Sequence, residues 1–162
     1  MRPVVIGGLA VNHHGYMRGT ADVDILVARR EAVALYRRLR SEPGWRRYSE
    51  GFKNTELGVG LHICVEGERT APGSTEEFPD PAQLLTVAVY PLPVPTLAEL
   101  LALKVVSGRA RDDADVVELL KRHRSQMASL KTAASRRLRT AEARRRLGAL
   151  VVRAKAEAKR RR

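Results

Sequence analysis

The feature that most constrains the fold is the run "ADVDILVA" (residues 21–28), where two aspartates two positions apart enter an apolar stretch. Alternating polar and apolar residues predict a β-strand, in which residues i and i+2 point to the same face. Asp22 and Asp24 therefore share a face, with Cβ atoms on the order of 7 Å apart. Neighbouring carboxylates repel each other and are costly to bury, so we expect a partner that compensates their charge.

A divalent cation is the partner that two such carboxylates suit best. Mg²⁺ is commonly held by one or two carboxylates together with substrate phosphates and water. Asp22 and Asp24 are therefore the predicted metal ligands, with Mn²⁺ as the alternative ion. Arg18 and Thr20 stand just before them and would add a guanidinium and a hydroxyl to the same site.

A glycine pair precedes the aspartates. "PVVIGGLAV" (residues 3–11) reads as a short buried strand that ends at Gly7 and Gly8 and leads into a helix. Glycines let the backbone approach a ligand closely, and free N–H groups at a helix start bind phosphate. Together, the glycines and the aspartates look like half of a nucleoside triphosphate site. Because the first strand starts at residue 3, we also expect that a helix packing before it is missing.

The remaining patterns alternate between strand-like and helix-like. We predict a helix over 30–42, one or two strands within 45–68, a loop over 69–81, a helix from residue 96 and another over 110–123. Thr96 with Glu99 three residues on has the spacing of a capping box. This order predicts an α/β (α+β) fold, a mixed β-sheet with helices packed on it.

The positive charge is confined to the last quarter of the chain. Residues 1–120 hold 14 Lys and Arg against 16 Asp and Glu, whereas residues 121–162 hold 16 against 2. We predict a domain over 1–122 and a basic helical arm over 123–162, formed by one long amphipathic helix or a broken pair. From residue 125 on, the arm suits nucleic-acid phosphates, an acidic membrane surface or an acidic partner helix, or it covers the domain with its apolar stripe.

Composition narrows the classes further. Aromatic residues make up 4% of the chain, which argues against a platform that stacks single-stranded bases. Cys64 is the one cysteine, so no disulfide framework forms within the chain and a reducing cytoplasm is the expected location. No stretch reaches the length of a transmembrane helix.

The segment "VIGGLAVNHHGYMRGTADVDILV" resembles the signature of the nucleotidyltransferase superfamily that includes DNA polymerase beta, in its minimal bacterial form, which also occurs in abortive-infection-type toxins. The resemblance resumes in "TLAELLALKVVSGRARDDADVVELLK" and covers about residues 4–122. It implies a mixed sheet with helices on one side. It also implies Mg²⁺-dependent transfer of a nucleoside monophosphate from an NTP to a hydroxyl or phosphate of RNA, such as tRNA, or of a protein, in a toxin–antitoxin setting with an antitoxin partner.

The resemblance also assigns roles by position. Gly7 and Gly8 would contact the triphosphate, and Asp22 and Asp24 would ligate Mg²⁺. Three later positions match family features: Lys104 would lie near the nucleotide phosphates, and Arg109 and Asp115 belong to an Arg-x-x-Asp-x-x-Asp motif, with Asp115 the best candidate for a site contact. Asp112 is the middle residue of that motif.

One position departs from the family pattern. The family places a third carboxylate on a later strand, and the matching stretch "GLHICVEG" carries His62 there. Imidazole is a poorer Mg²⁺ ligand than carboxylate, but its near-neutral pKa suits a general base. Alternatively, Glu66 reaches in from the strand end, or His62 is a core histidine in an inactive relative.

Weaker candidates complete the reading. His13 and His14 lie either at the cleft or on the surface of the first helix, and Cys64 with His62 forms a conceivable nucleophile–base pair. The leading hypothesis is an Mg²⁺-dependent nucleotidyltransferase. The alternative is a degenerate domain of the same fold that binds nucleotide or RNA without catalysis.

Overall fold

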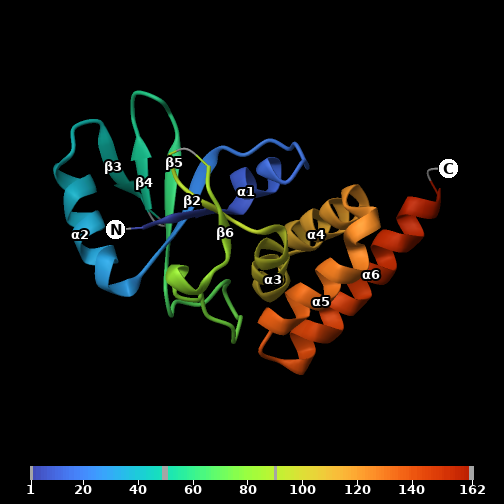
Figure 1. Ribbon diagram of the computed structural model, residues 1–162. Helices are drawn as coiled ribbons and strands as arrows, with labels where there is room; N and C mark the ends of the chain where they lie inside the picture. Colours follow the sequence, from blue (N-terminus) through green and yellow to red (C-terminus); the bar gives the residue numbers. More distant parts are fainter. Residues whose placement is uncertain (1, 49–50, 90, 161–162) are drawn as a thin grey trace.

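The computed structural model describes residues 2–48, 51–89 and 91–160. A five-stranded mixed sheet stands beside a bundle of helices, with α2 on the far side of the sheet from the bundle (Figure 1). The elements are β1 (Val4–Ile6), α1 (Gly7–His13), β2 (Asp22–Val27), α2 (Arg29–Ser41), β3 (Trp45–Tyr48), β4 (Gly51–Asn54), β5 (Gly60–Val65), η1 (Pro81–Gln83), β6 (Thr86–Val87), β7 (Val94–Pro95), α3 (Leu97–Ser107), α4 (Ala110–Arg122), η2 (Arg124–Gln126), α5 (Met127–Arg137) and α6 (Ala141–Arg160). The predicted mixed sheet with packed helices is confirmed at this level, but the expectation of helices on one side is wrong, because α2 packs on one face and α3 on the other.

The sheet has the strand order β1-β2-β5-β4-β3. β2 and β5 run parallel at its centre, and the other neighbouring pairs are antiparallel. In the parallel pair, Asp22 lies opposite Gly60 and Asp24 opposite His62. The aspartate pair and His62, where the sequence departs from the family pattern, are therefore neighbours on adjacent strands.

The two faces of the sheet bury different sets of residues. Ile25 and Ile63 pack with the apolar stripe of α2. Leu26 and Cys64, one position further along each strand, pack on the opposite face, where Leu103 of α3 contacts them. Because side chains alternate along a strand, Asp24 and His62 belong to the face that α3 covers.

The basic C-terminal region is a broken pair of helices rather than one long helix. α5 and α6 join α3 and α4 in a single apolar cluster, to which α6 contributes buried residues such as Leu147 and Val151. Their apolar stripe is therefore covered, and their charged faces remain outside. Within the described residues, no helix combines the length and the apolar character that crossing a lipid bilayer requires. Arg161 and Arg162 lie outside the described residues.

The predicted capping box at α3 is wrong. Thr96 is the N-cap residue, but among the described residues its side chain makes no capping hydrogen bond. Glu99 is buried instead, where it accepts hydrogen bonds from the Leu85 backbone N–H at 3.3 Å and from Nε of Arg137 at 2.5 Å. An acid in the first turn of α3 thus fixes the end of α5, because a buried carboxylate requires a charged partner.

Candidate active site

Asp24 and His62 meet at one wall of a cleft between the sheet and the helices. The register of β2 and β5 places them side by side, and Nδ1 of His62 lies 3.0 Å from Oδ1 of Asp24. The cleft has a volume of about 580 Å³. Gly7 lines it from the start of α1 and Asp24 from β2, and Lys104 and Arg109 line it from the helical side.

Gly7 brings the backbone of the β1–α1 junction directly against Asp24. Its φ of +63° lies in the left-handed region, and a Cβ at this position would stand 1.8 Å from Oδ2 of Asp24. Gly8 is equally confined, because a Cβ there would stand 2.7 Å from Oγ1 of Thr20. Only glycine satisfies both positions, so the pair is required by the close approach of the chain to the aspartate strand.

Asp22 begins β2 and is exposed, whereas Asp24 is half-buried. Oδ1 of Asp22 lies over Gly60, where a Cβ would stand 2.1 Å away. Asp22 and Asp24 thus share the predicted face, with Asp22 beside Gly60 and Asp24 beside His62. Only Asp24 of the two lines the cleft, in the part of the chain that the structure describes.

Lys104 is buried and held between two carboxylates of α4. Its Nζ lies 2.5 Å from Oδ1 of Asp112 and 2.8 Å from Oδ2 of Asp115, and all three side chains are at most 6% exposed. Its predicted place near nucleotide phosphates stays a prediction. The residue lines the cleft, but two buried aspartates already neutralise its ammonium group.

Arg109, which also lines the cleft, is far more accessible than Lys104. Its side chain is 60% exposed, and its Nε donates to Oδ2 of Asp112 at 2.6 Å and to Oγ of Ser107 at 3.1 Å. Burial opposes the charge of Asp112, but Lys104, Arg109 and Ser107 outweigh it and hold the pKa of that carboxyl below its usual value. Asp112 therefore stays ionised and orients Arg109 at the mouth of the cleft.

Arg18 and Asp115 bind each other. Nε and Nη2 of Arg18 donate to the two oxygens of Asp115 at 2.8 and 2.9 Å, which ties the turn before β2 to α4. Asn12 closes the same turn through two hydrogen bonds with the backbone of Arg18. Thr20 donates to the backbone oxygen of Asp22 at 3.1 Å. Arg18, Thr20 and Asp115 thus position the aspartate strand, and none of them lines the cleft within the described residues.

Neither the contacts of Asn12 nor the ion pairs of Asp112 were predicted from the sequence. An asparagine six residues before an arginine gives no specific signal. Asp112 stands eight residues after Lys104, on the next helix, and only packing brings the two together.

Glu66 does not complete the site, and that alternative is wrong. It follows β5 at the end opposite His62, and its Oε2 accepts a hydrogen bond from the backbone N–H of Arg29 at 3.1 Å. His14 also faces elsewhere: its Nε2 lies 2.8 Å from the backbone oxygen of Pro95. Cys64 is buried and lines the cleft.

Asp22 and Asp24 alone are too few ligands for Mg²⁺, so the substrate would have to complete the site. Among the described residues, no group of three or more His, Cys, Asp and Glu side chains lies close enough to hold a metal ion. Asp22 and Asp24 offer carboxylate oxygens on one face, and substrate phosphates and water supply the remaining ligands that Mg²⁺ takes in such sites.

Two comparisons with known proteins were negative. No model of a known protein family matches the chain, and no curated protein matches its sequence.

Proposed function

We propose that the protein is an Mg²⁺-dependent nucleotidyltransferase that moves a nucleoside monophosphate from an NTP to a hydroxyl or phosphate of an RNA or protein acceptor. One observation carries the proposal: the backbone of Gly7, the carboxylate of Asp24 and the imidazole of His62 converge on one wall of a 580 Å³ cleft. The closeness of Asp24 leaves no room for a side chain at Gly7, so bare backbone lines the cleft at this point.

The residues divide the work of the reaction. Asp22 and Asp24 would hold the metal ion, Asp24 from the cleft wall and Asp22 from the start of β2 beside it, and the ion would neutralise part of the charge of the triphosphate. Arg109, oriented by Asp112, faces the cleft as the cation for the phosphates. The acceptor oxygen attacks the α-phosphorus, the bond to the bridging oxygen breaks and pyrophosphate leaves. His62 takes the hydroxyl proton, and the Asp24 carboxylate stabilises the imidazolium that forms.

The test is nucleotide transfer by the purified full chain. Each α-labelled NTP is incubated with Mg²⁺ or Mn²⁺ and total RNA, and label is followed into RNA and into protein. We expect transfer that falls at least about 100-fold in Asp24→Asn and in His62→Gln, because metal binding and general-base catalysis each contribute on that order. Glu142→Gln, an exposed acid of α6 far along the chain, is the matched control and should transfer normally.

His62→Asp separates the enzyme from the alternative. A carboxylate at this position restores the third acid of the family pattern, so the variant should transfer label, with Mg²⁺ serving at least as well as in the native protein. If the folded native chain transfers nothing with any NTP or metal but binds NTP, and His62→Asp gains activity, the native protein is a catalytically degenerate nucleotide binder. If neither transfers or binds NTP, the proposal is wrong.

A further inference from the structure

An open groove between α5 and α6 carries positive charge without acidic residues. Its volume is about 470 Å³, and its lining consists of three cations and two hydroxyl residues: Lys131, Arg136, Arg144, Thr132 and Ser135. The basic arm therefore gathers part of its charge in one concave surface, which we call the cationic groove. A concave surface of one charge sign concentrates ligands of the opposite sign.

The cations of the cationic groove have no acidic partner among the described residues. Arg137, Arg146 and Arg153 are neutralised by carboxylates. Lys131 and Arg136, by contrast, are exposed and make no ion pair or side-chain hydrogen bond with any described residue. Arg144 uses Nη2 to bind the backbone oxygen of Leu138 at 2.8 Å and also lacks a carboxylate in the described chain.

Because no carboxylate of the described chain neutralises these charges, the cationic groove can attract an anionic ligand.

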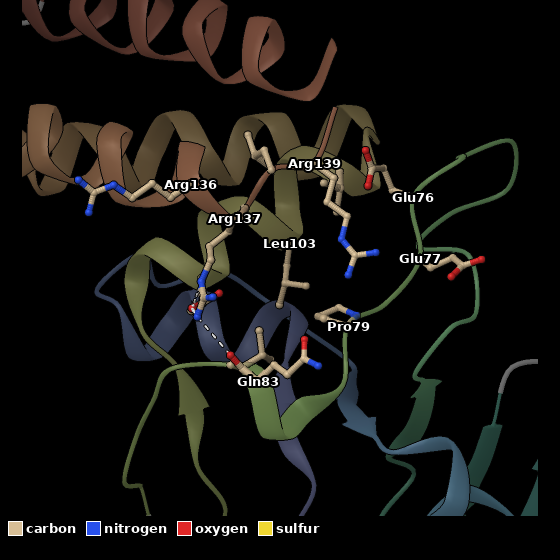
Figure 2. A pocket seen from close by; sticks show the side chains of 13 residues that line it. Glu76, Glu77, Pro79, Gln83, Leu103, Arg136, Arg137 and Arg139 are labelled. Carbon is tan, nitrogen blue, oxygen red and sulfur yellow. Dashed lines mark hydrogen bonds and ion pairs between the residues drawn. The ribbon is translucent and has the colours of Figure 1, made fainter. Parts of the chain in front are cut away.

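A second pocket, of about 240 Å³, adjoins the cationic groove. Arg136 lines both. Figure 2 shows Arg137 and Arg139 reaching from the end of α5 toward the segment of Pro79 and Gln83, and Arg137 donates to the backbone oxygen of Gln83 at 3.1 Å. The second pocket in turn shares Leu103 with the cleft of Asp24. The second pocket thus lies between the cationic groove and the candidate active site, and its lining also includes Glu76, Glu77 and Glu99.

We propose that the cationic groove binds the phosphate backbone of a single-stranded nucleic acid whose end reaches the cleft, so that the nucleic acid is the acceptor. The role of the nucleic acid as acceptor rests on the proposed function, whereas its binding to the cationic groove does not. A chain of phosphates matches a row of unpaired cations and hydroxyls. With few aromatic residues to stack bases, recognition is through the backbone and is independent of sequence.

The covered apolar stripe decides between a nucleic acid and a membrane. A helix that lies on a bilayer inserts an apolar face between the lipids. In α5 and α6 that face is buried against α3 and α4, and Val152 is the one large apolar residue exposed on them in the described chain. The exposed surface offers charge alone, which favours a polyanionic strand.

The first test measures binding of the full chain to a fluorescently labelled single-stranded RNA by anisotropy over a range of salt concentrations. The variant is Lys131→Gln with Arg136→Gln. Its matched control is Arg37→Gln with Arg40→Gln, two exposed arginines of α2 on the other side of the molecule (Figure 1). Both double variants lose the same net charge, so general attraction changes equally in the two.

We expect the groove variant to bind about 25-fold more weakly at 0.1 M salt, with a salt slope shallower by about 1.4, because each contact to a single strand contributes about 0.7 to that slope. The control should stay within about twofold. Equal weakening in both variants, or none in either, would overturn the proposal. So would binding of vesicles of anionic lipid in preference to RNA. A single-stranded DNA of the same length, run in parallel, tells whether the sugar is read.

The second test follows the path. An RNA carries photoreactive 4-thiouridine either at its 3′ end or several nucleotides inside. We expect the end position to crosslink to residues 97–109 or 68–79, and the internal position to residues 127–146. The reverse pattern would refute the path. Crosslinks and salt-dependent binding without nucleotide transfer would leave this inference standing and reject the enzyme, whereas transfer to protein without RNA binding would do the opposite.

Discussion

Lys104 shows how one residue can serve the structure while it stands at a site. Its ammonium group is the shared partner of Asp112 and Asp115. Arg18 binds both oxygens of Asp115, and Arg109 binds Oδ2 of Asp112. The five side chains join the turn before β2, the end of α3 and the first turns of α4. The cleft thus owes its shape to a buried ion network whose members are individually replaceable only at a cost.

The replacement Lys104→Met tests that role. The variant leaves two buried carboxylates short of a cation, so we expect a loss of about 3–5 kcal/mol in the free energy of unfolding. Lys155→Met, an exposed lysine of α6 with no acidic partner in the described chain, should change it by no more than about 0.5 kcal/mol. Urea unfolding of both variants provides the measurement. Normal stability in Lys104→Met with loss of nucleotide transfer would mean that the ammonium group acts on substrate alone.

At the scale of elements, His14 joins the end of α1 to β7 and α4. Nε2 of His14 donates to the backbone oxygen of Pro95, and Nε2 of His123 contacts the backbone oxygen of His14 at 3.0 Å. Burial lowers the pKa of His14 below its ordinary value of 6.5, and the nearby His13 and His123 act in the same direction, against the hydrogen bond to Pro95. The neutral ring is therefore the form that the fold requires.

This lowered pKa predicts a pH dependence of stability. The unfolded chain protonates His14 as the pH falls through about 6.5, and the folded chain does so only at lower pH, so the contribution is present above 6.5 and is lost on acidification. We expect the free energy of unfolding to fall between pH 7 and pH 5 in the native protein and to fall less in His14→Gln, which can still donate to Pro95. Asp112 does not interfere, since its lowered pKa moves its effect below 3.8. Equal slopes in the two proteins would exclude His14 as the cause.

The elements also show what the sequence can predict. The alternation of Asp22, Asp24 and the apolar residues after them placed a strand correctly, and the spacing of apolar residues found α2, α3 and α4, because each pattern is local. The contacts of Glu99 and Lys104 could not be predicted, since their partners Arg137, Asp112 and Asp115 come from other helices. A local rule assigned Glu99 to a cap at Thr96, and tertiary packing gave it to Arg137 instead.

On the scale of the whole molecule, the basic arm is part of the core. In the described chain, α5, α6 and Leu138 between them contribute nine buried residues to the cluster that also covers α3 and α4: Met127, Leu130, Ala134, Leu138, Ala143, Leu147, Leu150, Val151 and Ala154. Ion pairs of Arg146 with Asp113 and of Lys121 with Glu157 tie α4 to α6. The near-neutral and the basic parts of the sequence therefore differ in charge and share one apolar interior.

A chain that ends at residue 124 should consequently fail to fold cooperatively. Each large apolar side chain that loses its cover contributes about 1.5–3 kcal/mol, and a typical domain has only about 5–15 kcal/mol in total. We expect the shortened chain to lose its sharp thermal transition and to bind the dye ANS through the exposed faces of α3 and α4. Circular dichroism and ANS fluorescence measure both. A cooperative transition near that of the full chain would show that α5 and α6 are an appendage, and RNA binding could then be assigned by deletion. If the transition is lost, deletion cannot distinguish a missing nucleic-acid surface from a missing core. The substitutions that remove the charges of Lys131 and Arg136 then remain the valid test of that surface.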